Sequence, residues 1–160
     1  RVASSLAAAG PRRPASQGAS ARTLGLATTH FSPPHTMFDH VKFGVSDYAA
    51  SKVFFLKALE PLGVEAGSEG EPSSGIELCG RRNASLCLFQ AEDKPAPLHI
   101  AFLADTPQEV DAFYGAALEA GGKDNGAPGL RPRYHANYYA AFVIGPDGHN
   151  IEAVCHEPKA

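Results

Sequence analysis

The sequence predicts an α+β domain made of two copies of one unit, a strand and a helix followed by three strands. Two stretches repeat at a constant offset of 59 residues: segment 40–43 (HVKF) matches 99–102 (HIAF), and Phe54 and Leu59 match Phe113 and Leu118. A repeat of this length indicates one supersecondary unit used twice. We therefore expect paired βαβββ modules that form a curved, mixed sheet enclosing a cleft, with a helix packed on the outside of each module.

The first module opens with a segment that alternates apolar and polar residues over 38–46, the period of a strand with one face on a core. Asp47 is placed to cap a helix that runs to about Leu62, before Gly63 ends it. Stretches punctuated by Gly and Ser follow. Strands are expected near residues 75–80 and 84–90, and the second strand of the module has the weakest signal.

The second module repeats this plan. A strand is expected over 98–104, and Thr106 to Glu109 form a capping box with proline at the first helical position. Apolar residues then recur at helical spacing until a Gly-Gly pair stops the helix. The Gly- and Pro-rich segment 126–129 is expected to be a loop that leads to a hairpin with strands 138–144 and 150–156.

The chain divides by charge near residue 36. Residues 1–36 carry four arginines and no acid, so the remainder has 10 basic and 17 acidic residues, a balance of −7. We place the folded domain at 37–160, with modules at about 37–93 and 96–157. Three interpretations of residues 1–36 remain open: a disordered tail, a transit segment, or upstream sequence that is not translated. The expected location is cytoplasmic, or mitochondrial with a transit segment.

Composition excludes several classes of partner. An acidic domain without a basic stripe is a poor candidate for nucleic acid, and no apolar run approaches the roughly 20 residues that span a membrane. The three cysteines lack CxxC spacing and indicate reduced thiols. A small-molecule substrate is the expected partner.

Strand parity places three metal-binding residue types on faces turned away from the helices. When the apolar residues of each strand pack under a helix, His40, His99 and Glu152 point to the opposite face. If the sheets curve together, these faces line one cavity. Two imidazoles and a carboxylate suit a divalent ion such as Fe, Mn, Ni, Co or Zn, with positions left open for substrate. The alternative is hydrogen-bonded strand histidines and a surface carboxylate.

Residues from about 37 to 157 resemble the vicinal oxygen chelate superfamily, the glyoxalase, bleomycin-resistance and extradiol-dioxygenase group. The resemblance is carried by His40, by segment 99–102 and by the ending PDGHNIE at 146–152, although Gly145 stands where aspartate is usual. It implies that His40, His99 and Glu152 are metal ligands. It further implies an enzyme with lyase, transferase or dioxygenase chemistry on a small oxygen-rich molecule, or alternatively a non-catalytic binding protein of the bleomycin-resistance kind. Members often form homodimers, sometimes with the cleft at the interface.

Glyoxalase I-type members add a second glutamate on the last strand of module one. Here Ser85 and Cys87 hold the cavity positions of that strand, which favours three-ligand relatives. Cys87 could also be a nucleophile, and the alternative is a small buried residue without a chemical role.

The segment 131–139 (RPRYHANYY) resembles a run found in one glyoxalase-like branch of the superfamily. Arg131, Arg133 and Tyr138 are candidate substrate contacts, because arginines offer charge-assisted hydrogen bonds to an anion. Tyr134 and His135 are candidate catalytic acid or base groups. The alternative is a structured loop with packed tyrosines and solvated arginines. His149, at the hairpin turn, and His156 are expected to be exposed.

Overall fold

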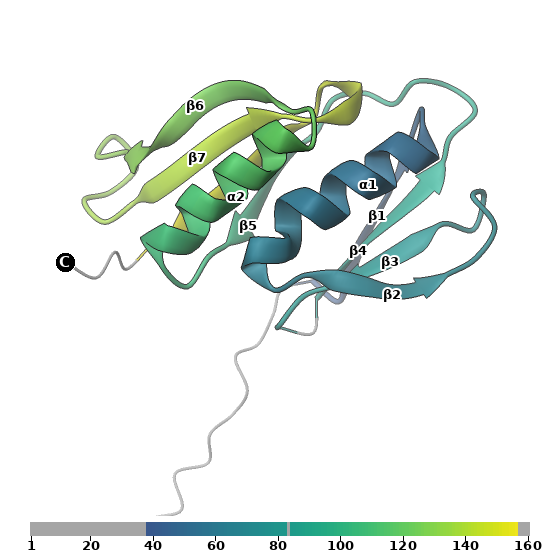
Figure 1. The fold of residues 1–160 in the computed structure, drawn as a ribbon, viewed down its shortest axis with the longest axis horizontal. Helices are drawn as coiled ribbons and strands as arrows, with labels where there is room; N and C mark the ends of the chain where they lie inside the picture. Colours follow the sequence, from purple (N-terminus) through teal and green to yellow (C-terminus); the bar gives the residue numbers. More distant parts are fainter. Residues whose placement is uncertain (1–37, 83, 157–160) are drawn as a thin grey trace, which may run out of the picture. The chain divides into compact units, whose positions relative to one another are not determined.

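The computed structural model describes residues 38–82 and 84–156, so the predictions made for residues 1–36 lie outside the described residues. The first module contains β1 (His40–Val45), α1 (Tyr48–Leu59), β2 (Glu65–Glu69), β3 (Ile76–Cys79) and β4 (Ser85–Gln90). The second contains β5 (His99–Leu103), α2 (Pro107–Glu119), β6 (Lys123–Leu130), β7 (Tyr139–Ile144) and β8 (Asn150–Cys155). Short 3-10 turns cover Glu60–Leu62 and Pro146–Gly148. The predicted α+β fold of paired βαβββ modules is confirmed (Figure 1).

The two modules have the same sheet topology. The strand orders are β1-β4-β3-β2 and β5-β8-β7-β6, and in each sheet the first pair is parallel and the others antiparallel. His40 lies opposite Ser85, and His99 lies opposite Asn150. Both histidines therefore stand at the start of an edge strand, at equivalent positions of the repeat.

Both helices begin at their predicted caps and α2 ends before the predicted Gly-Gly pair, but α1 ends at Leu59 and a 3-10 turn continues to Leu62. The Asp47 side chain accepts a 2.9 Å hydrogen bond from the Ala50 amide, and the Thr106 hydroxyl accepts one of 3.2 Å from the Glu109 amide. Gly63, with φ 71°, follows the 3-10 turn after α1, and Gly121, with φ 97°, follows α2. Both conformations favour glycine, which lacks a Cβ. Side-chain caps and left-handed glycines thus fix the length of both helices.

The expected loop at 126–129 is wrong, because these residues belong to β6. Gly126 lies opposite Phe142 and Gly129 opposite Ala140, with register shifts on either side of Gly126. The strand tolerates Pro128 because β6 is at the edge of its sheet, where a missing N–H costs no ladder bond. Gly and Pro here mark a bulged edge strand and not a connection between strands.

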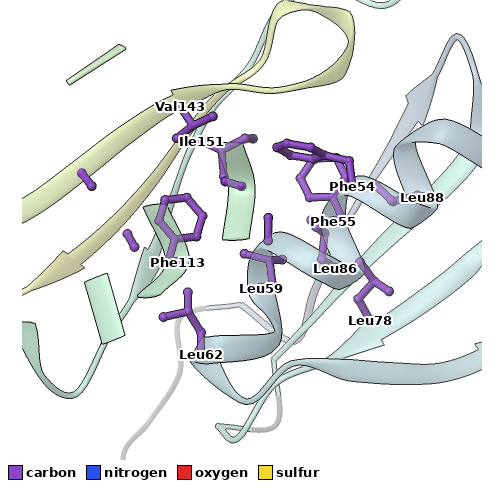
Figure 2. Packing of buried hydrophobic residues seen from close by; sticks show 14 of the residues in the cluster. Phe54, Phe55, Leu59, Leu62, Leu78, Leu86, Leu88, Phe113, Val143 and Ile151 are labelled. Carbon is purple, nitrogen blue, oxygen red and sulfur yellow. The ribbon is translucent and has the colours of Figure 1, made fainter. Parts of the chain in front are cut away.

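One hydrophobic core joins the two modules. The helices α1 and α2 contact each other, and the buried cluster draws residues from both. Figure 2 shows Phe54 and Phe55 of α1 in this cluster with Phe113 of α2 and Ile151 of β8. In the part of the chain that is described, neither helix is long and apolar enough to cross a membrane.

The Phe54 ring packs closely against two glycines of module two, Gly122 and Gly145. A Cβ on Gly145 would lie 2.8 Å from the Phe54 ring, and one on Gly122 would lie 3.1 Å from it. The aromatic side chain of module one therefore occupies space that two glycines of module two leave open.

Polar contacts also cross between the modules. The Arg81 guanidinium bonds to Asp105 at 3.1 Å and to Glu109 at 2.9 Å. The backbone amide and the hydroxyl of Ser46 both donate to the Asp147 carboxylate, the amide at 2.9 Å. Burial alone would raise the pKa of Asp147, but the hydrogen bonds from Ser46 hold this pKa below its usual value.

Candidate metal centre

His99 and Glu152 meet on the face of the second sheet that is turned away from α2. His99 Nε2 lies 2.8 Å from Glu152 Oε2. The strand β5 brings Ala101 opposite Glu152, so His99 is the diagonal neighbour of the carboxylate. Glu152 is 2% exposed, whereas the His99 side chain is 53% exposed. The pair thus consists of a buried carboxylate, Glu152, and a half-exposed imidazole, His99, that contacts it.

The second oxygen of this carboxylate is held by Tyr138. The tyrosine hydroxyl donates a 2.6 Å hydrogen bond to Glu152 Oε1. Burial first, and then this hydrogen bond, raises the pKa of Tyr138, so the hydroxyl keeps its proton and remains a donor at neutral pH. Tyr138 was expected to contact substrate, and the structure places its hydroxyl on the candidate metal ligand.

Glu152 lacks a permanent cation. Among the ion pairs of the described residues, its partner is His99 and no arginine or lysine. A buried carboxylate is costly unless it is paired and hydrogen-bonded. A bound cation would complete the pairing that Tyr138 and His99 begin.

His40 does not join this pair within one chain. Its Nδ1 lies 2.8 Å from Asp39 Oδ1, and its side chain is exposed at the edge of the first sheet. The described residues contain no group of three or more His, Cys, Asp or Glu side chains arranged to hold one metal ion. Parity gave the face on which each candidate lies, but one chain brings only His99 and Glu152 together.

The position of Glu152 is taken by Cys87 in the first module. Lys42 and Ala101 are equivalent in the repeat, and they lie opposite Cys87 and Glu152 respectively. Cys87 is partly buried, and Glu77 lies opposite it on β3. The face of the first sheet thus carries His40 and a thiol where the second carries His99 and a carboxylate.

The loop 131–138 folds over the Glu152 side of the second sheet. The Arg131 amide donates to the Tyr138 carbonyl at 2.7 Å, and the Tyr134 amide donates to the Arg131 carbonyl at 2.9 Å. The rings of Tyr134 and Tyr138 are 4.7 Å apart, centroid to centroid. The backbone of this loop is therefore ordered, and it brings Arg131, Tyr134 and Tyr138 to one side of the candidate site.

His135 has a partner that the sequence did not suggest. Its Nε2 lies 2.8 Å from Nδ1 of His156, and both rings lie against Tyr138, with centroids 5.3 and 5.2 Å from it. His156 is exposed, as expected. Only the fold brings them together, since His156 follows β8 and His135 lies in the loop before β7.

The expectation that His149 is exposed is wrong. It is fully buried, its Nδ1 accepts a 3.0 Å hydrogen bond from the Leu98 amide, and its ring packs edge-on against Phe43 at 5.1 Å. Burial lowers the pKa of His149, although Asp147 opposes the shift. A neutral imidazole therefore ties the hairpin turn to both modules.

Comparison with known proteins agrees with this architecture. Residues 37–153 match the Glyoxalase/Bleomycin resistance protein/Dioxygenase superfamily, and the chain belongs to this family. No curated protein gives a match.

Solved structures repeat the fold over most of the chain. A glyoxalase/bleomycin resistance protein from Albidiferax ferrireducens T118 is 28% identical, with a TM-score of 0.64, over 75% of this chain and 98% of that one. A glyoxalase-related enzyme from Fulvimarina pelagi is 18% identical, with a TM-score of 0.57, over 72% and 85%. The oxidase ChaP-H2 is 24% identical, with a TM-score of 0.56, over 78% and 97%. At these lower identities the last two show the shared fold alone.

Proposed function

We propose that the chain is a divalent-metal-dependent enzyme of the glyoxalase-like kind, acting on a small oxygen-rich molecule. The observation that carries this proposal is the buried Glu152 carboxylate, which faces the His99 imidazole and has no basic side chain beside it in the described structure. Imidazole and carboxylate suit Fe, Mn, Ni, Co or Zn. Such an ion supplies Lewis acidity toward substrate oxygens.

The third ligand, in this proposal, is His40 of a second copy of the chain. His40 and His99 begin strands at the edges of their sheets, and these edges carry exposed apolar side chains at Val41, Leu98 and Leu103. Two-fold pairing of β1 with β5 of another copy would cover this apolar surface. A two-fold axis repeats each contact, so a dimer would hold two such sites.

The chain's own residues supply orientation and proton transfer. Tyr138 keeps Glu152 in place through its hydrogen bond, which is the role of an outer-shell partner. His135 and Tyr134 flank Tyr138 and are the candidate acid or base groups. His135 Nδ1 accepts a 3.2 Å hydrogen bond from the Asn137 amide, so the neutral His135 ring donates from Nε2 to His156 Nδ1.

Metal content of the purified protein tests the proposal. We expect about one divalent ion per chain after incubation with Fe, Mn, Ni, Co or Zn, and loss of that ion in His99→Ala, Glu152→Gln and His40→Ala. A Glu119→Gln variant, which changes an exposed carboxylate at the end of α2, should retain it. Absence of stoichiometric metal with all five ions contradicts the proposal.

Mixed dimers separate the shared site from a site within one chain. A heterodimer of His40→Ala with His99→Ala contains one intact site only if the ligands come from two chains, and it should regain half of the metal. A heterodimer of His99→Ala with Glu152→Gln should regain none, because both changes affect the same half of the site. Equal recovery in the two mixtures contradicts the shared site.

The alternative is a metal-free binding protein of the bleomycin-resistance kind. The lack of a three-donor group within the described part of one chain favours it. Because a binding protein of this kind requires no ion, the same measurement of metal content decides between the metal-dependent enzyme and the metal-free binding protein.

A further inference from the structure

Arg131 is fixed in place by its surroundings. Its guanidinium donates to the backbone carbonyls of Ala127 and Leu130, and its Cζ lies 5.6 Å from the centre of the Phe142 ring. A guanidinium held over an aromatic face gains a cation–π contact as well as hydrogen bonds. The side chain is therefore positioned before any ligand arrives.

Two glycines of β6 make room for this guanidinium. A Cβ on Gly129 would lie 3.0 Å from Arg131 Nη1, and one on Gly126 would lie 3.5 Å from Nη2 and 3.0 Å from the Phe142 ring. Gly126 and Gly129, which led to the wrong prediction of a loop, thus provide the space in which the Arg131 side chain lies.

The positive charge at this place is not neutralised by the described residues. Arg131 and Arg133 take part in none of the ion pairs there, whereas Arg81 and Arg82 are both paired with carboxylates. Arg133 donates to the Tyr134 hydroxyl at 3.0 Å. A guanidinium has five N–H donors, so both arginines keep donors for a ligand.

The two arginines line one cavity that is open to solvent at the protein surface. It has a volume of about 510 Å³, and its walls include Asn125, Arg131, Arg133 and Phe142 but no carboxylate. Residues 37–160 carry a net charge of −7, so two arginines without acidic neighbours stand out on this domain. The cavity combines donors for an oxyanion with two apolar side chains, Leu130 and Pro132, against which a flat apolar group can lie.

We propose that this cavity binds the oxyanion of a small aromatic carboxylate or phosphate, with Arg131 and Arg133 on the anionic group and the apolar side chains of Leu130 and Pro132 beside the arene. The Phe142 ring lies 5.6 Å from Arg131 Cζ and 6.2 Å, centroid to centroid, from the His99 ring, so this one side chain contacts both Arg131 and a residue of the candidate metal centre. Anion binding in this cavity does not depend on the proposed enzymatic function. Only the identification of the anion as part of the substrate rests on that function.

Binding of benzoate and phenyl phosphate to chelator-treated protein tests the cavity without metal. Calorimetric titration should show saturable binding of at least one of them, and the tighter one identifies the anion. We expect Arg131→Gln to weaken this binding about tenfold, or ~1.4 kcal/mol, for one lost charge-assisted contact. Arg133→Gln should weaken it severalfold. Lys123→Gln, at the other end of β6, should leave it unchanged.

Several outcomes overturn the proposal. These are no binding of either anion, binding that is the same in Arg131→Gln and Arg133→Gln as in the parent, or equal binding of neutral benzamide. Arg133 is exposed, so its variant reports on the cavity even where Arg131→Gln fails to fold. Because the assay contains chelator, failure of the metal proposal leaves its result unaffected, and failure here leaves the metal measurement unaffected.

Discussion

Tyr138 and His99 hold the Glu152 carboxylate from two sides, with the tyrosine hydroxyl 2.6 Å from one oxygen and His99 Nε2 2.8 Å from the other. The carboxylate thus comes from the centre of a sheet, one partner from its edge strand and the other from a loop. The orientation of Glu152 is set by residues that lie up to 53 positions away in the sequence.

Removal of the Tyr138 hydroxyl should loosen the candidate ligand without disturbing the fold. Tyr138→Phe keeps the ring in place and leaves Glu152 Oε1 without its donor. We expect metal affinity to fall about 10-fold or more, as for other outer-shell changes. Competitive titration with a chromogenic chelator measures this. Tyr139→Phe is the matched control, because that hydroxyl donates to Asp111 on α2, and it should leave metal affinity unchanged.

Burial of His149 should make stability depend on pH. Its pKa in the folded state lies below that of the unfolded chain, about 6.5. The neutral imidazole therefore contributes its full stability above about pH 6.5, and this contribution is lost progressively as the pH falls from there toward the folded pKa. Urea unfolding at pH 8 and pH 5 should show a smaller loss of stability in His149→Gln than in the parent. Identical losses in both proteins contradict this assignment.

Substitution at Gly145 should disturb the packing of the Phe54 side chain. Gly145→Ala places a methyl group 2.8 Å from a buried ring, and we expect a loss of about 1–3 kcal/mol in the free energy of unfolding. Gly115→Ala is the control, because Gly115 is an exposed position of α2 where a Cβ meets nothing within 4 Å. This control should gain up to about 1 kcal/mol from helix propensity. Two equal losses would show that the Phe54 contact is not the cause.

A carboxylate at position 87 should add to the proposed shared site. Cys87 occupies the place in module one that Glu152 holds in module two, on the same face as His40. We expect Cys87→Glu to raise the metal affinity of the protein severalfold, since a fourth donor would join the three proposed ligands. Cys79→Glu, on the neighbouring strand β3, should not raise it. A gain that persists in the His40→Ala background would show that the new carboxylate acts elsewhere.

The sequence predicted the elements of this fold because their signals are local. The cap at Asp47, the capping box at Thr106 and the glycine stops depend on residues within one helical turn, and the structure contains all of them. Alternation in each strand likewise gave the faces that Phe43 and Ile151 bury.

Features that depend on distant contacts were not predictable in this way. Segment 126–129 is rich in Gly and Pro, and only its pairing with β7 makes it a strand. His149 follows a turn, where polar residues are usually exposed, and it is buried by Leu98 and Phe43 from other segments. The alternation of side chains in β1 predicted the sheet face on which His40 lies. It did not predict which residues of another sheet would lie near His40. These outcomes are set by tertiary packing, for which a single sequence carries no local signal.

The irregular shape of β6 has a consequence for how copies of this chain can associate. Its shifted register and Pro128 interrupt the row of backbone groups on one outer edge, and β2 at the other outer edge is also shifted in register. The edge strands β1 and β5, in contrast, follow an even register throughout. Strand addition is therefore directed to these two edges and discouraged at the others. An association that uses both at once closes on itself as a pair and leaves no regular edge from which a fibre could grow.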